Sequence, residues 1–258
     1  IAALAGDLAD CTVFEIGPGP GGLTRALLET EAAQIIAVEK DERCVAALAD
    51  LSDAAQGRLR LVPGDALKTS LPALAPPPRA IVANLPYNVG TELLLSWLHE
   101  IDAAAVAVAP PVSGHGAGLG AERSRPIYRS LTLMFQAEVA DRIAAQPHNK
   151  SYGRLSVIAQ FCCDVKRVLE VPASAFSPPP KVASAVVHLT PRANRPKDIP
   201  LAALERVTAA AFGQRRKMLR SSLKPLGGEE LLKRAHIDPE LRAENLSLTD
   251  YETLAKFV

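Results

Sequence analysis

Short apolar runs alternate with stretches of helical spacing along the first two-thirds of the chain. The apolar runs predict strands at 12–16, 35–38, 59–63, 80–83 and 131–136. Between them, apolar residues three and four positions apart predict helices at 23–29, 44–51 and 91–98. Two later strands are expected at 156–161 and 182–189. Regular alternation of strand and helix predicts an α/β fold, with a parallel sheet covered by helices on both faces.

The pattern changes after residue 190. A polar, Pro-containing stretch at 191–200 is typical of a domain boundary. The spacing after it predicts only helices, at 201–223, 229–235 and 248–257. Ser247 is expected to cap the last helix, because its hydroxyl can accept a hydrogen bond from a free amide of the first turn. We therefore expect an α/β domain at 1–190 and a small all-helical domain at 191–258.

The composition is that of an ordinary soluble globular protein. Hydrophobic residues make up 48% and charged residues 22% of the 258 positions. No apolar run approaches the roughly 20 residues that a membrane-spanning helix needs. No secretory signal is visible, so we expect a cytoplasmic protein without membrane contact.

The net charge of +1 conceals an uneven distribution. Residues 1–110 contain 7 Lys or Arg against 14 Asp or Glu, whereas 111–190 and 191–258 each carry a net charge of +4. An acidic first part joined to a basic second part fits a protein that binds a small cationic ligand beside a polyanionic macromolecule.

Cysteine and histidine usage points away from disulfides and metals. The cysteines form no CxxC pair, two of them are adjacent, and the five histidines show no ligand spacing. We therefore expect free thiols in a reducing cytoplasm and no metal site. The cysteines are Cys11, Cys44, Cys162 and Cys163.

The first strand is joined to the first helix by a Gly-rich segment, EIGPGPGG at 15–22. Glycines there let the backbone turn tightly and approach a ligand closely. Glu39 ends the second strand and can accept two hydrogen bonds from ribose hydroxyls, and Asp65 ends the third and can accept one from an adenine amino group. These groups predict a crevice for a nucleotide-containing cofactor. The glycine spacing also fits nicotinamide binding, so the loop alone leaves that alternative open.

The motif after the fourth strand, Asn84-Leu85-Pro86-Tyr87, separates the two alternatives. It resembles the N-[LI]-P-Y signature of enzymes that methylate the N6 amino group of adenine. That nitrogen is a poor nucleophile, because its lone pair is delocalised into the ring. The Asn84 side chain and the Leu85 or Pro86 carbonyl would accept the amino hydrogens and favour a more pyramidal nitrogen. Tyr87 would stack on a base removed from its helix or loop.

Longer stretches narrow the resemblance to one family. From about Thr12 to the C-terminus, the chain is similar to the ribosomal RNA adenine dimethyltransferases that act near the 3′ end of small-subunit RNA, the KsgA/Dim1 family. The matching stretches are VFEIGPGPGGLT, NLPYNVGTELL, LMFQAEVADRI, SYGRLSVIAQ, VPASAFSPPPKVASAVVHL, FGQRRKMLRSSL and IDPELRAENLSLTDY. The resemblance implies a Rossmann-like methyltransferase sheet that uses S-adenosylmethionine. It also implies two methyl transfers to each of two adjacent adenosines in a hairpin loop, with small-subunit rRNA in a pre-ribosomal particle as the partner of a monomeric enzyme.

The resemblance also implies roles for individual residues. Gly17 would contact the methionine part of the cofactor, Glu39 its ribose and Asp65 its adenine, while Asn84 and Pro86 would orient the target amino group. The cofactor-binding candidates are Glu15, Gly17, Gly19, Glu39, Lys40, Asp65, Ala66 and Asn84. The catalytic candidates are Asn84, Leu85, Pro86, Tyr87 and Phe176.

Phe176 begins the segment FSPPPK, a polyproline-like loop that would hold its ring fixed. The resemblance implies that Phe176 and Tyr87 sandwich the target base. The alternative is that Phe176 is simply a core residue.

Basic residues gather in the C-terminal part, within one helical pattern that contains no acid between residues 211 and 224. Lys217, Arg220 and Lys224, at positions i, i+3 and i+7 of this pattern, would share one helical face. A basic stripe suits phosphate contacts, and a solvated helix face is the alternative. The RNA-binding candidates are Arg154, Lys181, Arg215, Arg216, Lys217, Arg220 and Lys224.

The sequence departs from the family pattern in three places. A G-Q-N-F-L segment that closes over cofactor and substrate would lie just before Ile1, so we expect the chain to be truncated there and its activity to suffer. Ala137 stands where the family usually has Lys, which removes one expected phosphate contact. The stretch at 110–126, rich in Gly, Pro and Ser, predicts an exposed inserted loop longer than in typical members.

Three other functions are weighed against this one. A relative that acts on large-subunit RNA is disfavoured by the basic C-terminal motif and the closing ENLSLTDY. A non-catalytic assembly or transcription factor on the same fold is disfavoured by the intact NLPY motif. A nicotinamide oxidoreductase is disfavoured by that motif and by the basic second part.

Overall fold

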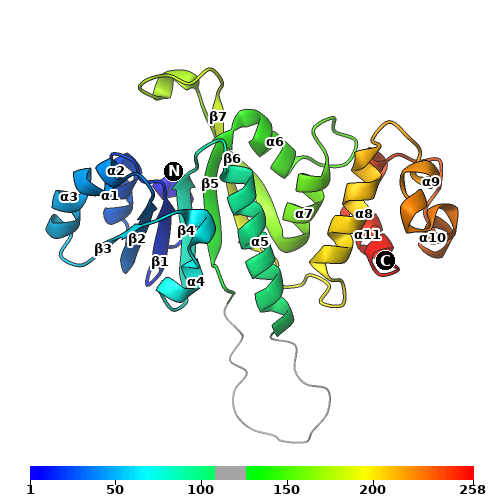
Figure 1. The fold of residues 1–258 in the computed structure, drawn as a ribbon, viewed down its shortest axis with the longest axis horizontal. Coiled ribbons are helices and arrows are strands. Elements are labelled where there is room, and N and C mark those ends of the chain that lie inside the picture. Colours follow the sequence, from blue (N-terminus) through cyan, green and yellow to red (C-terminus); the bar gives the residue numbers. More distant parts are fainter. Residues whose placement is uncertain (108–125) are drawn as a thin grey trace, which may run out of the picture.

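The computed structural model describes residues 1–107 and 126–258, which are built around one seven-stranded sheet (Figure 1). The strand order is β3-β2-β1-β4-β5-β7-β6. The bounds are β1 Thr12–Ile16, β2 Gln34–Glu39, β3 Leu59–Pro63, β4 Arg79–Asn84, β5 Ser130–Gln136, β6 Cys163–Val171 and β7 Ser184–Pro191. The inserted loop expected at 110–126 lies outside the described residues, except for Pro126.

The strands β1 to β5 pair in parallel, whereas β7 runs antiparallel to both β5 and β6. The α/β class is confirmed, but the expectation of a parallel sheet is wrong for the last two strands. The reason is the connection between them, a hairpin loop at 172–183. There the chain reverses without the crossover helix that parallel neighbours need. Figure 1 shows this loop projecting beyond the body of the sheet.

Helices cover both faces of the sheet, because neighbouring strand residues point to opposite sides. Val13 belongs to the hydrophobic cluster that contains Leu27 of α1, and Phe14 to the larger cluster that contains Trp97 of α5 and Phe161 of α7. The helices are α1 Gly22–Leu28, α2 Glu42–Ala47, α3 Ala49–Ala54, α4 Leu71–Leu74, α5 Gly90–Ala107, α6 Ala137–Ala144, α7 Arg154–Cys162, α8 Leu201–Gly213, α9 Leu219–Ser222, α10 Gly228–Arg234 and α11 Leu248–Ala255. Short 3₁₀ helices lie at Ala2–Leu4, Ala66–Lys68, Ala173–Ala175, Lys224–Leu226 and Ala243–Asn245.

The strand predicted at 156–161 is wrong, because these residues form α7. Their apolar side chains are buried on nearly every side, and a short continuous apolar run fits a buried helix as well as a buried strand. A local contact favours the helix, since the Gly153 amide donates to Ser156 Oγ at 3.0 Å at the start of α7. The strand that does exist, β6, follows at once from Cys163.

The single helix predicted at 201–223 is also wrong. α8 ends at Gly213, and α9 begins only at Leu219. The Leu219 amide donates to the Leu241 carbonyl at 2.7 Å, and the Arg220 amide to the Pro239 carbonyl at 3.1 Å. These bonds to another segment replace the helical bonds, so the basic residues from 215 to 224 do not share one helix.

The C-terminal helices pack onto α7, and aromatic rings mark the junction. The Tyr152 ring, just before α7, meets the Phe212 ring of α8 edge to face at 5.9 Å between centroids. The Phe212 ring stacks on that of Tyr251 of α11 at 5.7 Å. One hydrophobic cluster therefore runs from the sheet into the C-terminal helices. The predicted cap of α11 is confirmed, since the Asp250 amide donates to Ser247 Oγ at 3.2 Å.

Three general features complete the fold. Within the described ranges, no helix is long and apolar enough to cross a membrane. All four cysteines carry free thiols, as expected, and three of them are buried. In the same part of the chain, His, Cys, Asp and Glu side chains nowhere gather in a group of three that could hold a metal ion.

Candidate active site

The carboxyl ends of β1, β2 and β3 open onto one cavity of about 340 Å³, as the strand order requires. The predicted cofactor residues Gly17, Glu39 and Asp65 line it, each from a different strand end. Pro86 and Val89 close its other side. The sequence therefore brings the three predicted contacts together, although they lie 22 and 26 residues apart in the chain.

The Gly-rich loop takes a conformation that only glycine adopts easily. Gly17, Gly19 and Gly21 have φ of +67°, +54° and +86°. At Gly21 a Cβ atom would lie only 2.5 Å from Leu48 Cδ2, so another residue there would have to displace the Leu48 side chain. The Gly19 amide donates to Glu39 Oε2 at 3.2 Å. The loop is therefore held against β2 by the same carboxylate that is expected to bind ribose.

The acids at the other two strand ends are oriented by the chain itself. Glu39 Oε1 accepts from the amides of Lys40 and Asp41, both at 2.8 Å. Asp65 Oδ2 pairs with Lys40 Nζ at 3.0 Å, and its Oδ1 accepts from the Leu67 amide at 3.1 Å. The Lys40 contact, helped by the Leu67 amide, lowers the pKa of Asp65. This carboxylate is therefore ionised at neutral pH and can accept further hydrogen bonds from a ligand.

Glu15 lies beneath the loop and is only 1% exposed. Within residues 1–107 and 126–258, neither of its carboxylate oxygens lies in hydrogen-bonding geometry with a donor, and the buried hydroxyl of Thr24 likewise has no partner. Burial raises the pKa of Glu15 to about 7, while Thr24 and Glu39 make smaller contributions of opposite sign. A buried acid without a partner is costly, and Glu15, like the predicted contacts Gly19 and Asn84, is not among the residues that line the cavity.

The motif after β4 is held by the start of α5. The Leu85 amide donates to the Met134 carbonyl at 3.3 Å. The Pro86 carbonyl accepts from the amides of Val89 and Gly90 at 3.2 and 3.0 Å, so it belongs to the first turn of α5. Among the described residues no donor is bonded to the Leu85 carbonyl. Of the two carbonyls proposed from the sequence, the structure therefore favours Leu85 as the acceptor.

A second pocket of about 240 Å³ lies beside the first. Its lining comes from the motif on one side and from the hairpin loop on the other: Asn84, Leu85, Pro86, Tyr87, Phe176, Pro178 and Pro180. Tyr87 is 41% exposed, whereas Phe176 is half-buried. Pro86 lines both cavities, so the second pocket adjoins the cofactor cavity. Two aromatic rings and an amide around such a pocket suit a flat, polar-edged ring such as a nucleobase.

One contact in this pocket has no signal in the sequence. The Tyr87 hydroxyl lies 2.7 Å from Ser184 Oγ, at the first residue of β7. The two residues are 97 positions apart. Only the placement of β7 beside β5 brings them together.

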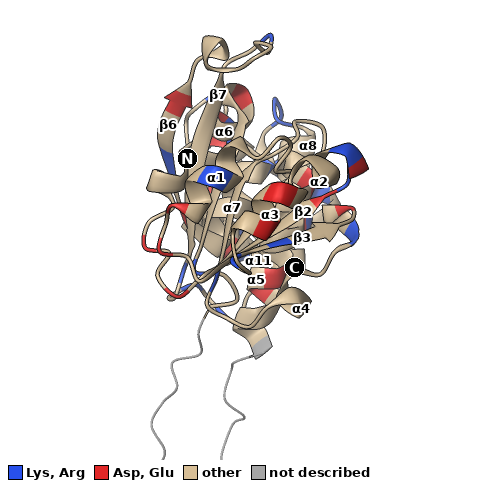
Figure 2. Cartoon of the chain, turned by 90° about the vertical axis from the view of Figure 1, so that its left-hand side faces the viewer, with Lys and Arg blue, Asp and Glu red and all other residues tan. Residues whose placement is uncertain are grey.

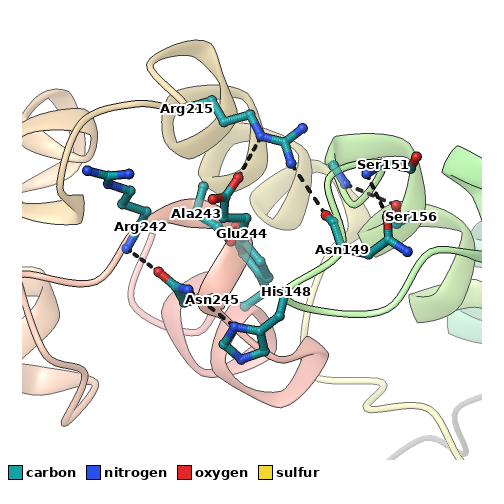
Figure 3. A network of polar contacts seen from close by, with 11 residues as sticks. His148, Asn149, Ser151, Ser156, Arg215, Arg242, Ala243, Glu244 and Asn245 are labelled. Atoms are coloured by element: carbon teal, nitrogen blue, oxygen red, sulfur yellow. Dashed lines mark hydrogen bonds and ion pairs between the residues drawn. The ribbon is translucent and has the colours of Figure 1, made fainter.

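The Arg215 side chain makes hydrogen bonds to other residues of the chain (Figure 3). Its Nε donates to Glu244 Oε2 at 2.8 Å, and its Nη2 donates to the Asn149 carbonyl at 3.5 Å. The Glu244 carbonyl in turn accepts from the His148 amide at 2.8 Å. These bonds tie the loop before α7 to the C-terminal helices. Arg215 therefore has a structural role that the sequence did not predict.

The other RNA-binding candidates fall into two groups, those that form an ion pair and those that do not. Arg154 Nη2 lies 3.5 Å from Glu205, and Arg220 Nη1 lies 3.9 Å from Glu240. In the described part of the chain the remaining four form no ion pair and are exposed: Lys181, Arg216, Lys217 and Lys224. Lys181 lies on the hairpin loop beside the second pocket, Arg216 and Lys217 lie in the turn between α8 and α9, and Lys224 begins the 3₁₀ helix after α9.

The end of the molecule away from the C-terminal helices carries acidic residues. Figure 2 views the end of the sheet that carries α1, α2 and α3, and the red segments of α3 mark its acidic residues. The cofactor cavity lies in this acidic part of the chain, and the exposed basic groups lie beyond β5. The charge division seen in the sequence is therefore also a division in space.

Known proteins resemble this chain over nearly its whole length. The model of the family described as "Ribosomal RNA adenine dimethylase" matches residues 7–258. A protein named "Ribosomal RNA small subunit methyltransferase A" from Allorhizobium ampelinum is 51% identical over 261 residues, covering 100% of this chain and 86% of its own length. Its namesake from Caulobacter vibrioides is 54% identical over 245 residues, covering 95% and 85%.

A solved structure extends the likeness to the fold. The crystal structure of a dimethyladenosine transferase from Plasmodium falciparum superposes with a TM-score of 0.75 at 25% identity, covering 98% of this chain and 92% of that one. The likeness includes the C-terminal helices, because almost no part of either chain lies outside it.

Proposed function

The chain belongs to the ribosomal RNA adenine dimethylase family, and we propose that it methylates the N6 atoms of two adjacent adenosines in a hairpin near the 3′ end of small-subunit rRNA. It is an rRNA adenine dimethyltransferase that uses S-adenosylmethionine. The observation that carries the proposal is the pair of adjoining cavities that share Pro86. One suits a nucleotide-containing cofactor, and the other suits a base.

The residues of the larger cavity fit the cofactor. Gly17, whose left-handed backbone glycine adopts easily, would let the chain approach the methionine part closely, and the buried Glu15 would place an acid behind the cavity wall. Glu39 would hold the ribose hydroxyls and Asp65 the adenine amino group, with Lys40 and Ala66 completing the wall. When bound, S-adenosylmethionine supplies an electrophilic methyl group.

The smaller pocket would hold the target adenine with its amino group toward the cofactor. Tyr87 and Phe176 would stack on its two faces and replace the neighbours that it loses in the RNA. The Asn84 side chain and the Leu85 carbonyl would accept hydrogen bonds from the two N6–H groups. These bonds would increase the electron density in the N6 lone pair. Since the acceptors stand ready before the base arrives, they cost no reorganisation during the reaction.

The rest of the chain would hold the RNA. We propose that residues 1–190 form the catalytic domain and 191–258 an RNA-binding domain. The exposed cations would contact phosphates: Lys181 beside the base pocket, and Arg216 and Lys217 in the turn between α8 and α9. The substrate would be small-subunit rRNA within a pre-ribosomal particle, bound by a monomer in the cytoplasm.

Two alternatives predict different products. A large-subunit RNA methyltransferase would share the catalytic pocket, but the relatives at 51% and 54% identity are named for the small subunit. A non-catalytic assembly factor would not need Asn84 and Tyr87 exposed beside the cofactor cavity.

The test is an in vitro methylation with isotopically labelled S-adenosylmethionine. The substrates are unmethylated small-subunit particles and, in parallel, large-subunit particles. We expect N6,N6-dimethyladenosine at two adjacent positions in the small-subunit RNA alone. Label in the large-subunit RNA would favour the first alternative. Binding to small-subunit particles without methylation of either RNA would favour the second.

A further inference from the structure

The Tyr87 ring is half exposed, yet its outer end is fixed to the sheet. Its hydroxyl lies 2.7 Å from Ser184 Oγ, and Ser184 is completely buried. Exposed aromatic side chains normally exchange between rotamers. This hydrogen bond joins the phenol to a rigid partner and so restricts the ring to one orientation.

Ser184 is rigid because it belongs to the middle of three strands. It pairs with Gln136 of β5 on one side and with Val171 of β6 on the other. The residue before it is also held, since the Ala183 carbonyl accepts from the Ala137 amide at 2.9 Å. The hydroxyl of Ser184 therefore stands at a fixed point of the sheet.

The same residue closes the loop that carries the other aromatic ring. The pair of Val171 and Ser184 forms the base of the hairpin loop at 172–183, and Phe176 lies within that loop. Tyr87 and Phe176 line the same pocket from two different segments, the motif after β4 and the hairpin loop. One serine thus touches the first ring directly and anchors the loop of the second.

We propose that Ser184 is a positioning residue that sets the orientation of Tyr87 and the width of the slot between Tyr87 and Phe176. The inference rests on the proposed function, because the slot must receive a base. Ser184 itself does not touch the base. Its hydroxyl acts through Tyr87, so its removal affects the use of RNA and leaves the cofactor cavity alone.

A purely structural role for this hydrogen bond gives a different result. In Ser184→Ala the half-exposed Tyr87 side chain can turn its hydroxyl to water, so the melting temperature should hardly change. In Tyr87→Phe the buried Ser184 hydroxyl is left without its partner, so stability should fall while the aromatic face remains. The two variants therefore share the loss of positioning but differ in stability.

The experiment is a double-mutant cycle with Ser184→Ala, Tyr87→Phe and the double variant. A neutral hydrogen bond corresponds to roughly 2- to 13-fold, so each single variant should lose about 3- to 10-fold in kcat/KM for RNA. The double variant should lose no more than either single one. Affinity for S-adenosylmethionine alone should stay at the parental value.

A second readout does not depend on methyl transfer. RNA with 2-aminopurine at the target position loses fluorescence when that base stacks, and Ser184→Ala should quench it less than the parent at saturating protein. Ser130→Ala is the matched control, since Ser130 is 5% exposed and donates to the Ala5 carbonyl at 3.3 Å, away from the pocket. That control should match the parent in both readouts.

Two results would overturn the proposal. One is parental kcat/KM and parental quenching in Ser184→Ala. The other is losses in Ser184→Ala and Tyr87→Phe that multiply in the double variant, because they would show independent roles. If the parent quenches 2-aminopurine but methylates nothing, the proposed function fails, and the effect of Ser184 on stacking can still be read.

Discussion

The two cavities that meet at Pro86 are organised in opposite ways. In the cofactor cavity the chain itself orients the acids: Glu39 accepts from three backbone amides, and Asp65 pairs with Lys40. In the base pocket Asn84 and Tyr87 are exposed, and within the described residues the Leu85 carbonyl has no partner. The acids of the first cavity are thus already hydrogen-bonded within the chain, whereas the polar groups of the second stand open to a ligand.

The largest expected effect separates the two cavities by function. Asn84→Ala should leave cofactor affinity near the parental value and abolish most turnover, because it removes an acceptor for the target amino group. Loss of one preorganised polar contact of this kind costs roughly 100- to 1000-fold in rate. Calorimetry with S-adenosylmethionine and single-turnover methylation measure the two quantities.

Glu39→Ala should have the opposite effect to Asn84→Ala, because it changes the cofactor cavity and leaves the base pocket intact. It should weaken cofactor binding, because the loop loses the bond to Gly19 and the ribose loses its acceptor. If both variants lost affinity and rate in the same proportion, the division between the cavities would be wrong.

The next effect tests whether Phe176 serves the base pocket or the core. Phe176→Ala should lower single-turnover methylation by roughly 5- to 150-fold, the equivalent of a base–aromatic stack of about 1–3 kcal/mol. Phe176→Trp should retain much of the activity, because the aromatic face is what matters. The ring is only half-buried, so the melting temperature should change little. A large fall in melting temperature with normal activity in the folded fraction would instead make Phe176 a core residue.

A smaller effect concerns the basic surface. Reversing Arg216 and Lys217 to Glu should weaken RNA binding across sequences. It should also flatten the dependence of log K on log salt by about 0.7 for each lost phosphate contact. Titrations of RNA at several salt concentrations measure this slope.

Arg215→Gln is the control within the same segment. Because Arg215 pairs with Glu244, its loss should lower the melting temperature and leave the salt slope nearly unchanged. If Arg215→Gln flattened the slope as much as the reversal of its two neighbours, the distinction between structural and RNA-binding cations would not hold.

The smallest effect is a pH-dependent change in stability at Glu15. Burial raises the pKa of this acid from 4.5 to about 7, so the folded state binds its proton more tightly than the unfolded state. The contribution of Glu15 to stability therefore falls as the pH rises from about 4.5 through 7. Glu15→Gln mimics the protonated form. In cofactor-free protein it should match the parent at pH 5 and melt about 2–6 °C higher at pH 8. An equal gain at both pH values would mean that ionisation of Glu15 is not the cause.

Sequence patterns predicted the part of the fold that forms the cofactor cavity. Strands β1 to β4 have short apolar runs that end in Gly, Glu, Asp and Asn, and their order along the chain matches the parallel pairing. Gly17, Glu39 and Asp65 could therefore be placed together, because parallel strands share one carboxyl edge. The residue-level roles at these positions stay predictions.

The patterns failed where contacts between distant segments decide the structure. The apolar run at 156–161 suits strand or helix equally, and burial against the sheet decides for α7. The helix predicted at 201–223 is interrupted after Gly213, where the amides of Leu219 and Arg220 donate to the segment near Leu241. Similarly, the bond between Tyr87 and Ser184 depends on a β7 strand that is inserted between β5 and β6. No local pattern encodes such placements.

We propose that this chain dimethylates two adjacent adenosines through the pocket that contains Asn84. The decisive test is mass spectrometry of small-subunit RNA from cells that lack the gene, complemented with the parental gene or with Asn84→Ala. With the parental gene, we expect N6,N6-dimethyladenosine at two neighbouring positions. Without the gene, or with Asn84→Ala, we expect unmodified adenosine at both positions. Full dimethylation in cells that carry only Asn84→Ala, or in cells without the gene, would contradict it.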